Sequence, residues 1–316
     1  METVRHISPA DLHRINLLLA RAFTQGRVDE GYRFTEVPQC RIEFLELYLD
    51  SCPEASYLYE VDGRILAFGF SHLWGKVGWI GPVAVAPDVQ GRGHGREIME
   101  LCVEGLKKQG AATIGLETMP RSYRNLGLYG KLGFVPGKLT VDFAKEVFPH
   151  AESPAERPRA QARVYKAGEQ DFLDEAAAVA RAVCGDLDYT GLILGTEKHG
   201  YGYSLLLQQG GRRALAVIHT EPYAADEERH VLRVVALAIP PPVDPAFLDA
   251  VVATLEDWAR KEFLGHINFR VPTTQLAAYR YFLNAGHRIV HSDLRMHLDG
   301  YDLRTQPGGW LLDKWE

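Results

Sequence analysis

The sequence has little cysteine, no long apolar run and no excess of basic residues. Its four cysteines, Cys40, Cys52, Cys102 and Cys184, lie far apart without a CxxC pair, which predicts neither a zinc site nor a disulfide framework. No apolar run approaches the ~20 residues that a membrane-spanning helix needs, and residues 1–9 carry charges where a signal peptide has an apolar stretch. We therefore expect a cytoplasmic protein with neither a metal site nor a membrane partner.

The charge and composition narrow the function classes further. A net charge of -6 at pH 7 disfavours sequence-independent binding to nucleic-acid phosphates, so no nucleic-acid partner is expected. A cationic or neutral partner fits this charge more easily. Apolar residues make up 46% of the chain and charged residues 24%, as in ordinary globular proteins that bury a core.

The length predicts two domains. A chain of 316 residues suits two units of roughly 150 residues each. Residues 146–163 contain three prolines and lack apolar periodicity after Phe148, which is typical of an interdomain connection. We predict a first domain over residues 1–147, a linker over 148–162 and a second domain over 163–316.

Hydrophobic periodicity and turn residues predict a mixed sheet with helices in the first half. Helical spacing covers residues 11–23, 40–49, 96–109 and 123–132, and Gly133 stands where a helix C-cap glycine is favoured. Extended segments cover residues 56–61, 64–70, 77–86, 113–118 and 135–143. Asp62 and Gly63 are suited to a tight hairpin turn between the first two of these strands.

The second half repeats this order. The spacing of Asp11 and residues 20–22 recurs in Asp171 and residues 180–182. Strands are predicted over residues 212–219, 232–239, 267–271 and 289–298, with helices over 246–262 and 276–283. This shared order favours an internal duplication, and the fold class is α/β, with helices on a mixed sheet in each half.

A glycine loop follows one predicted strand and opens a helix. Residues 90–96 read Gln-Gly-Arg-Gly-His-Gly-Arg, and backbone amides at a helix N-terminus favour an anion. The dinucleotide fingerprint fails, because its third glycine would fall on Arg96 or Ile98, and the Gly-Lys-Ser/Thr of the Walker loop is absent. The loop therefore predicts a polyphosphate site of another type.

Two motifs together resemble the GNAT superfamily of N-acetyltransferases. They are Gln-x-x-Gly-x-Gly, preceded by Val-x-Val-x-Pro, and Leu-Tyr-x-x-x-Gly-Phe at residues 128–134. The resemblance implies two GNAT-like domains, each a mostly antiparallel sheet flanked by helices, with acetyl-CoA as co-substrate. It implies that the coenzyme pyrophosphate binds Gln90, Gly91, Arg92, Gly93, His94, Gly95 and Arg96. It also implies that a strand diverges from its neighbour and binds the pantetheine arm through the backbone of Val83, Ala84 and Val85.

The resemblance also implies an acid in the second motif. Attack of an amine on the thioester expels a thiolate, and the phenol of Tyr129 is the candidate general acid. Where the family often has an asparagine that contacts the coenzyme, this sequence has Ser122, and Asn125, one helical turn before Tyr129, is the candidate substitute.

A base and an acceptor are harder to identify. Glu117 and His72 are the candidates for removing a proton from the amine. In the loop over residues 24–39, Asp29, Glu30 and Tyr32 are candidates for shaping the site of a small-molecule amine or a peptide amine. A coenzyme-binding sensor without turnover remains an alternative.

The second half is predicted to lack the coenzyme loop. Residues 240–245 include four prolines at the equivalent position, and proline has no N–H to donate to a phosphate. Tyr279, Tyr281 and Gly286 retain part of the tyrosine-glycine motif, with His287 in place of its phenylalanine. The hypothesis is a degenerate half that forms one wall of the acceptor pocket.

Overall fold

The computed structural model describes residues 2–148 and 157–315. The N-terminal half contains, in chain order, β1 (Glu2–His6), α1 (Leu12–Asp29), α2 (Ile42–Ser51), β2 (Tyr57–Val61), β3 (Arg64–Trp74), β4 (Val77–Val85), α3 (His94–Lys108), β5 (Thr113–Thr118), α4 (Tyr123–Lys131) and β6 (Phe134–Glu146). The C-terminal half contains β7 (Gln161–Val164), α5 (Gln170–Val183), α6 (Thr190–Lys198), β8 (Gly202–Gln209), β9 (Arg212–His219), β10 (Val231–Ile239), α7 (Pro245–Lys261), β11 (His266–Pro272), α8 (Leu276–Asn284), β12 (Arg288–Leu298) and β13 (Trp310–Asp313). The predicted fold class is confirmed.

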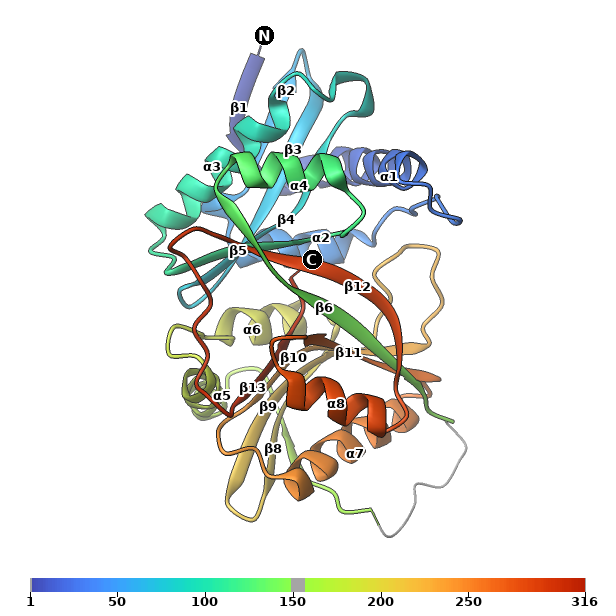
Figure 1. The fold of residues 1–316 in the computed structure, drawn as a ribbon, viewed down its shortest axis with the longest axis vertical. Helices are drawn as coiled ribbons and strands as arrows, with labels where there is room; N and C mark the ends of the chain where they lie inside the picture. Colours follow the sequence, from blue (N-terminus) through green and yellow to red (C-terminus); the bar gives the residue numbers. More distant parts are fainter. Residues whose placement is uncertain (1, 149–156, 316) are drawn as a thin grey trace.

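The two halves exchange the long strands β6 and β12. The sheet order is β1-β2-β3-β4-β5-β12-β6-β11-β10-β9-β8-β7, with β13 paired to β10. Thus β12 of the second half pairs with β5 of the first, and β6 of the first half pairs with β11 of the second. In Figure 1, β6 and β12 run side by side between the upper and lower halves, as their antiparallel pairing requires. The sheet is therefore continuous across both halves.

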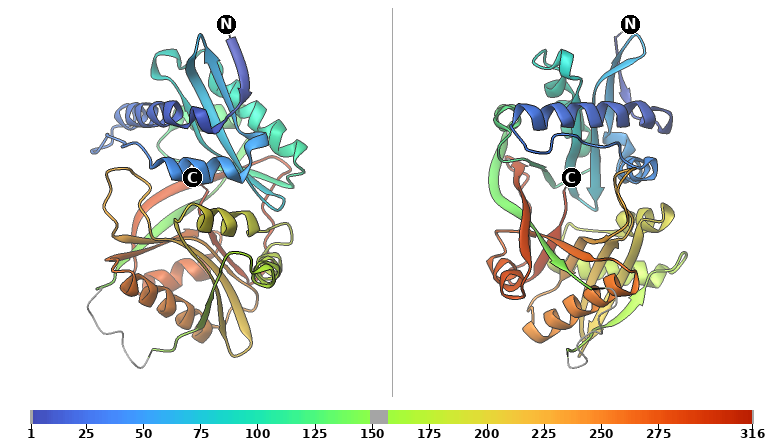
Figure 2. Two further views of the ribbon diagram at one scale, coloured as in Figure 1. Left: turned by 180° about the vertical axis from the view of Figure 1, so that it is seen from behind. Right: turned by 90° about the vertical axis from the view of Figure 1, so that its right-hand side faces the viewer.

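Helices cover both faces of the N-terminal part of the sheet. Figures 1 and 2 show α3 and α4 on one face and α1 and α2 on the other. The α3 side packs through Ile98, Met99, Cys102 and Leu106, all fully buried, at the helical spacing that the sequence predicts. A second core joins the halves, because Trp74 and Trp79 pack with residues of α5, α6 and β9. The site described below lies within this frame.

The observed elements extend or add to the predicted ones. Helix α1 continues to Asp29, into the segment predicted as loop, and β1, α6, β7, β8 and β13 had no predicted counterpart. The added strands β1 and β7 have only 5 and 4 residues and gain their stability from pairing with a neighbour. The boundary at residues 148–162 stays a prediction, and residues 149–156 lie outside the described part. No described helix has the length and apolar character to cross a membrane.

Candidate active site

The strands β4 and β5 diverge at the centre of the N-terminal half. They pair in parallel only at Val77, Gly78 and Trp79, although β4 continues to Val85 and β5 to Thr118. Beyond Trp79, β4 remains bonded to β3 through Val83, Ala84 and Val85, so its other edge faces a gap with free backbone groups. The predicted divergence is confirmed, and binding of a pantetheine arm there stays a prediction.

The glycine loop closes the open end of this gap. Gly91 and Gly93 have φ values of 81° and 100°, a backbone region that is costly for residues with a side chain. The amides of residues 91–96 donate no hydrogen bond to any other described residue. They lie at the N-terminus of α3, where the helix dipole is positive. The loop is therefore an exposed set of donors that suits an anion.

The loop, the strand and the tyrosine helix meet at Gly95. A Cβ built on Gly95 would lie 3.3 Å from the side chain of Val85 and 3.6 Å from that of Leu128. Gln90 links the same parts, because its Nε2 donates to the carbonyl of Val85 at 3.2 Å and its Oε1 accepts from Arg124. The two sequence motifs thus come together around one site.

Tyr129 lies buried on α4, beside this junction. Its ring packs edge-on against Phe134, with 6.1 Å between the centroids. Its hydroxyl makes no hydrogen bond to another described residue. Burial raises the pKa of Tyr129 to about 12, so the phenol keeps its proton at neutral pH. A protonated phenol in this position is suited to donate a hydrogen bond or a proton.

The comparisons agree with this geometry. Residues 20–134 match the model of the acetyltransferase (GNAT) family. That segment contains the diverging strands, the glycine loop and the tyrosine helix. Residues 20–134 of the N-terminal half are thus similar to the GNAT family.

Known proteins are similar to this chain in part of its sequence and in its fold. The ribosomal protein bS18-alanine N-acetyltransferase of Escherichia coli is 33% identical over 73 residues, which are 23% of this chain and 49% of that protein. The chain thus spans about half the length of the curated relatives that it matches. The match with a tandem GNAT protein from the clavulanic acid biosynthesis pathway covers 94% of this chain and 98% of that protein. Its TM-score is 0.57, at 11% sequence identity. The match with a GCN5-related N-acetyltransferase of Sphaerobacter thermophilus covers 94% of this chain and 95% of that protein. Its TM-score is 0.59, at 14% sequence identity. At these identities, both matches show a likeness in fold alone.

Three further polar residues lie on or at the start of α4, near the two motifs. Ser122 is buried at the start of α4, and Asn125 is half-buried one turn before Tyr129. Arg124, which the sequence analysis did not single out, lies on α4 within reach of the loop through Gln90. In the sequence, Arg124 could have been noticed only as a positive charge close to the second motif.

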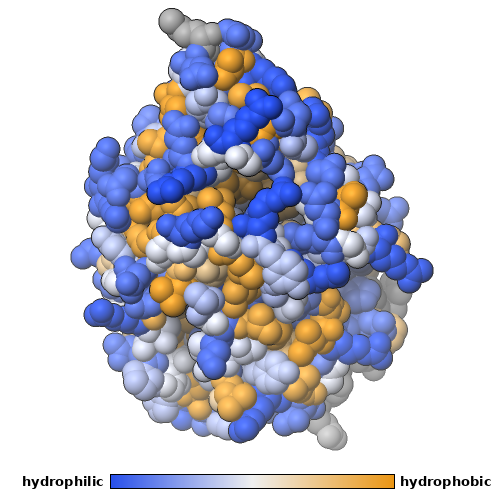
Figure 3. All heavy atoms as spheres, turned by 45° about the horizontal axis from the view of Figure 1, so that its top comes forward, coloured by the Kyte–Doolittle hydropathy of each residue, from blue (hydrophilic) through white to orange (hydrophobic). Residues whose placement is uncertain are grey.

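In Figure 3, the face brought forward from the top of Figure 1 is hollowed near its centre, with hydrophobic atoms inside and hydrophilic residues at the rim.

His72 lies on β3, and the ring of Tyr48 from α2 meets it edge-on at 4.6 Å. Its Nε2 donates to the carbonyl oxygen of Gly81 at 2.9 Å, and its ring stacks on Trp79 with 3.8 Å between the centroids. Burial lowers the pKa of His72 to about 3. The imidazole is therefore neutral at physiological pH and is a weak base.

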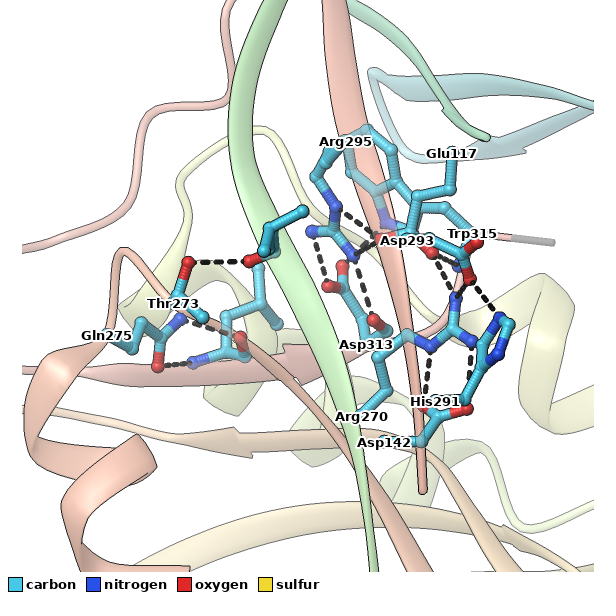
Figure 4. A network of polar contacts seen from close by, with 12 residues as sticks. Glu117, Asp142, Arg270, Thr273, Gln275, His291, Asp293, Arg295, Asp313 and Trp315 are labelled. Carbon is cyan, nitrogen blue, oxygen red and sulfur yellow. Dashed lines mark hydrogen bonds and ion pairs between the residues drawn. The ribbon is translucent and has the colours of Figure 1, made fainter. Parts of the chain in front are cut away.

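Glu117 belongs to a buried network that joins both halves (Figure 4). It accepts from Arg270 at 2.5 Å and from Arg295 at 2.8 Å. Arg270 also pairs with Asp142 at 2.7 Å and with Asp293 at 3.0 Å. Burial raises the pKa of Glu117, but the charges of Arg295 and Arg270 outweigh burial and hold the pKa below its usual range. This environment favours a structural role for Glu117 over that of a base.

The loop after α1 reaches the mouth of the gap. Arg121 lies in the turn between β5 and α4. Its guanidinium carbon lies over the ring of Tyr32, 5.0 Å from the ring centroid. Asp29 faces Arg124 at 3.8 Å. One carboxylate oxygen of Glu30 is buried and has no hydrogen-bond partner among the described residues. The predicted acceptor residues thus lie beside the coenzyme motifs, and their contact with an acceptor stays a prediction.

Within residues 157–315, the segment between β10 and α7 forms no comparable loop. Between β10 and α7, the carboxylate of Asp244 accepts from the amide of Phe247 at 2.9 Å and so caps the helix itself. The residual tyrosines serve packing and helix contacts, since Tyr281 donates to Asp249 at 2.7 Å and Tyr279 packs on Phe143. No group of three or more metal-ligating side chains occurs within residues 2–148 and 157–315.

The glycine loop leads to a first prediction. Gly93→Val is expected to weaken acetyl-CoA binding about tenfold or more, because a β-branched residue at a φ of 100° distorts the donor loop. Gly110→Val is the matched control, since Gly110 has a φ of 81° and similar open space but lies at the far end of α3. Calorimetric titration with acetyl-CoA measures both variants, and equal affinities would show that the loop is not the binding site.

Proposed function

We propose that the chain is an acetyl-CoA-dependent N-acetyltransferase that transfers the acetyl group to a primary amine by direct attack. The observation that carries this proposal is the set of amides at residues 91–96 that donate no hydrogen bond to the described part of the chain. They lie at the end of a strand whose inner edge is open. These donors bind the coenzyme pyrophosphate, with positive charge from Arg92, Arg96 and Arg124. Among relatives, the bS18-alanine N-acetyltransferase supports an amine as the acceptor.

The open edge of β4 sets where the reaction takes place. The backbone of Val83, Ala84 and Val85 binds the pantetheine arm, in continuation of β3. From Val85 to Gly81 the strand covers about 13 Å at ~3.3 Å per residue, which brings the thioester towards the point where β4 leaves β5. Tyr129 then donates a proton to the thiolate as it leaves.

Proton removal from the amine takes place through water or in solution. Both candidate bases are weak here, because the pKa of His72 is about 3 and the pKa of Glu117 lies below its usual range. The amine therefore reaches the thioester in its neutral form or passes its proton to water.

The pH dependence of kcat/KM follows from these pKa values. We expect kcat/KM to rise with pH towards the pKa of the acceptor amine itself, with no separate step near pH 6.5 from a histidine. No decrease is expected below about pH 10, because Tyr129 with a pKa of about 12 stays protonated. Initial rates between about pH 5 and about pH 10 measure this, because the range includes the ordinary histidine pKa of about 6.5. A decrease in kcat/KM between about pH 8 and about pH 9, with the protein still folded, would show that the acid is not a tyrosine with a pKa of about 12.

A thiol-release screen tests the proposal. Free coenzyme A is measured after mixing acetyl-CoA with polyamines, aminoglycosides, amino acids and peptides with a free N-terminus, and mass spectrometry detects the acetylated product. We expect calorimetric binding of acetyl-CoA and turnover of at least one class. Binding without turnover of any amine would favour the alternative, a coenzyme-binding sensor. No binding would contradict both.

A further inference from the structure

A small cavity lies between α2 and α6, where the two halves meet. Its walls are largely aromatic, with contributions from both halves: Phe44, Tyr48, His72, Trp74, Trp79 and Tyr223. These rings already contact one another, since His72 stacks on Trp79 at 3.8 Å and Tyr48 meets the edge of His72 at 4.6 Å. Aromatic walls of this kind favour a flat apolar group that stacks or packs edge-on.

The cavity adjoins the point where β4 leaves β5. Trp79 in its wall is the last residue of β4 that pairs with β5, opposite Gly115. His72, in the same wall, is bonded to the carbonyl of Gly81. Under the proposed function, the thioester ends near Gly81. A group bound in the cavity therefore lies next to the reacting carbon.

The charges in the cavity wall do not suit a polycation. Asp50 is its acidic residue, and it is already paired with Lys198 at 2.6 Å and with His199 at 2.8 Å. Burial lowers the pKa of His72 and of His219 to about 3, so both rings are neutral. A polyamine would bring a second ammonium group into the cavity, and Asp50 in the wall is already paired. Burying a charge without a partner is costly.

The size of the cavity limits what enters. It offers about 60 Å³ to the centres of water molecules, whereas one water needs about 10–15 Å³ on the same measure. The space inside the cavity is thus of the size that suits one small ring.

We infer that this cavity binds the side group of the acceptor, and that the acceptor is a primary amine carrying one aromatic ring on a short chain. The ring packs among Trp79, His72 and Tyr48, and the amine points towards Gly81. This inference rests on the proposed function and narrows its substrate class.

Gly191 is a position in the cavity wall where a side chain can be added without strain. It lines the cavity, its backbone is helical, and a Cβ there would meet no atom within 4 Å. Gly191→Leu therefore adds an apolar side chain at the cavity wall without a clash. Gly185→Leu is the matched control, since Gly185 has equally open surroundings and lies outside the cavity wall.

The test uses 2-phenylethylamine as the probe, with spermidine as a ringless comparison. Trp74 and Trp79 in the wall report binding through tryptophan fluorescence, which requires no turnover. We expect saturable binding of 2-phenylethylamine to the unmodified chain and to Gly185→Leu, binding at least tenfold weaker to Gly191→Leu, and no fluorescence response to spermidine. We also expect 2-phenylethylamine to release coenzyme thiol from acetyl-CoA.

Several results would overturn the inference. They are equal affinity of Gly191→Leu and the unmodified chain, absence of 2-phenylethylamine binding, or turnover of spermidine that Gly191→Leu leaves unchanged. Calorimetry with acetyl-CoA separates this failure from failure of the proposed function. Intact acetyl-CoA binding without ring binding rejects the cavity alone, whereas loss of acetyl-CoA binding rejects the proposed function.

Discussion

Replacing Tyr129 by phenylalanine is expected to lower kcat by about 10²–10⁴-fold, with the affinity for acetyl-CoA unchanged. The substitution removes one oxygen atom and leaves the ring against Phe134. The hydroxyl has no hydrogen bond to another described residue, so its removal costs the fold little. Steady-state rates with a turned-over amine and calorimetry with acetyl-CoA give the two quantities.

Tyr123→Phe in the same helix is the matched control. The Tyr123 side chain is 82% exposed, and we expect its loss of a hydroxyl to leave kcat within twofold of the original, as is usual for surface changes. If Tyr129→Phe also kept its turnover, the tyrosine would serve only to pack α4 on the sheet. The general acid would then have to be sought elsewhere.

The parts of the site that are local in sequence were predictable. The glycine loop needs a strand, positive φ values and a helix N-terminus within a few residues, and each of these leaves its own sequence signal. Strand β5 was predicted at its observed bounds, Thr113–Thr118. The positions of Gly91 and Gly93 follow from the same reasoning, since both adopt the backbone region that favours glycine.

The long-range parts were not predictable from periodicity. The segment of β6 reads as a strand whichever sheet it joins, and nothing in its own residues states that it pairs with β11. Glu117 looked like a strand-end carboxylate because its partners, Arg270 and Arg295, lie more than 150 residues away. Pairing between distant strands depends on the whole fold, so the role of a charged residue on such a strand emerges only with the structure.

The exchanged strand β12 depends on Arg295, and this leads to the second large prediction. Arg295 lies fully buried and pairs with Glu117 of β5 and Asp313 of β13, at 2.8 Å each, and its guanidinium lies 4.1 Å from the ring centroid of Trp315. Arg295→Met would leave both carboxylates buried without this partner. Removing one member of a buried ion pair costs about 3–5 kcal/mol, which we expect to lower the melting temperature by about 10 °C.

The pH dependence of this loss has a definite sign. The pKa of Glu117 lies below its usual value in the folded chain, so its ion pairs stabilise the fold above the pKa of the unfolded carboxyl and are lost as the pH falls through the folded pKa. The deficit of Arg295→Met is therefore expected to be largest near neutral pH and to shrink in acid. Arg64→Met is the control, because Arg64 and Asp88 are both 52% exposed and such pairs contribute at most about 1 kcal/mol. Equal melting temperatures for the two variants would mean that the network is not what holds β12 between β5 and β6.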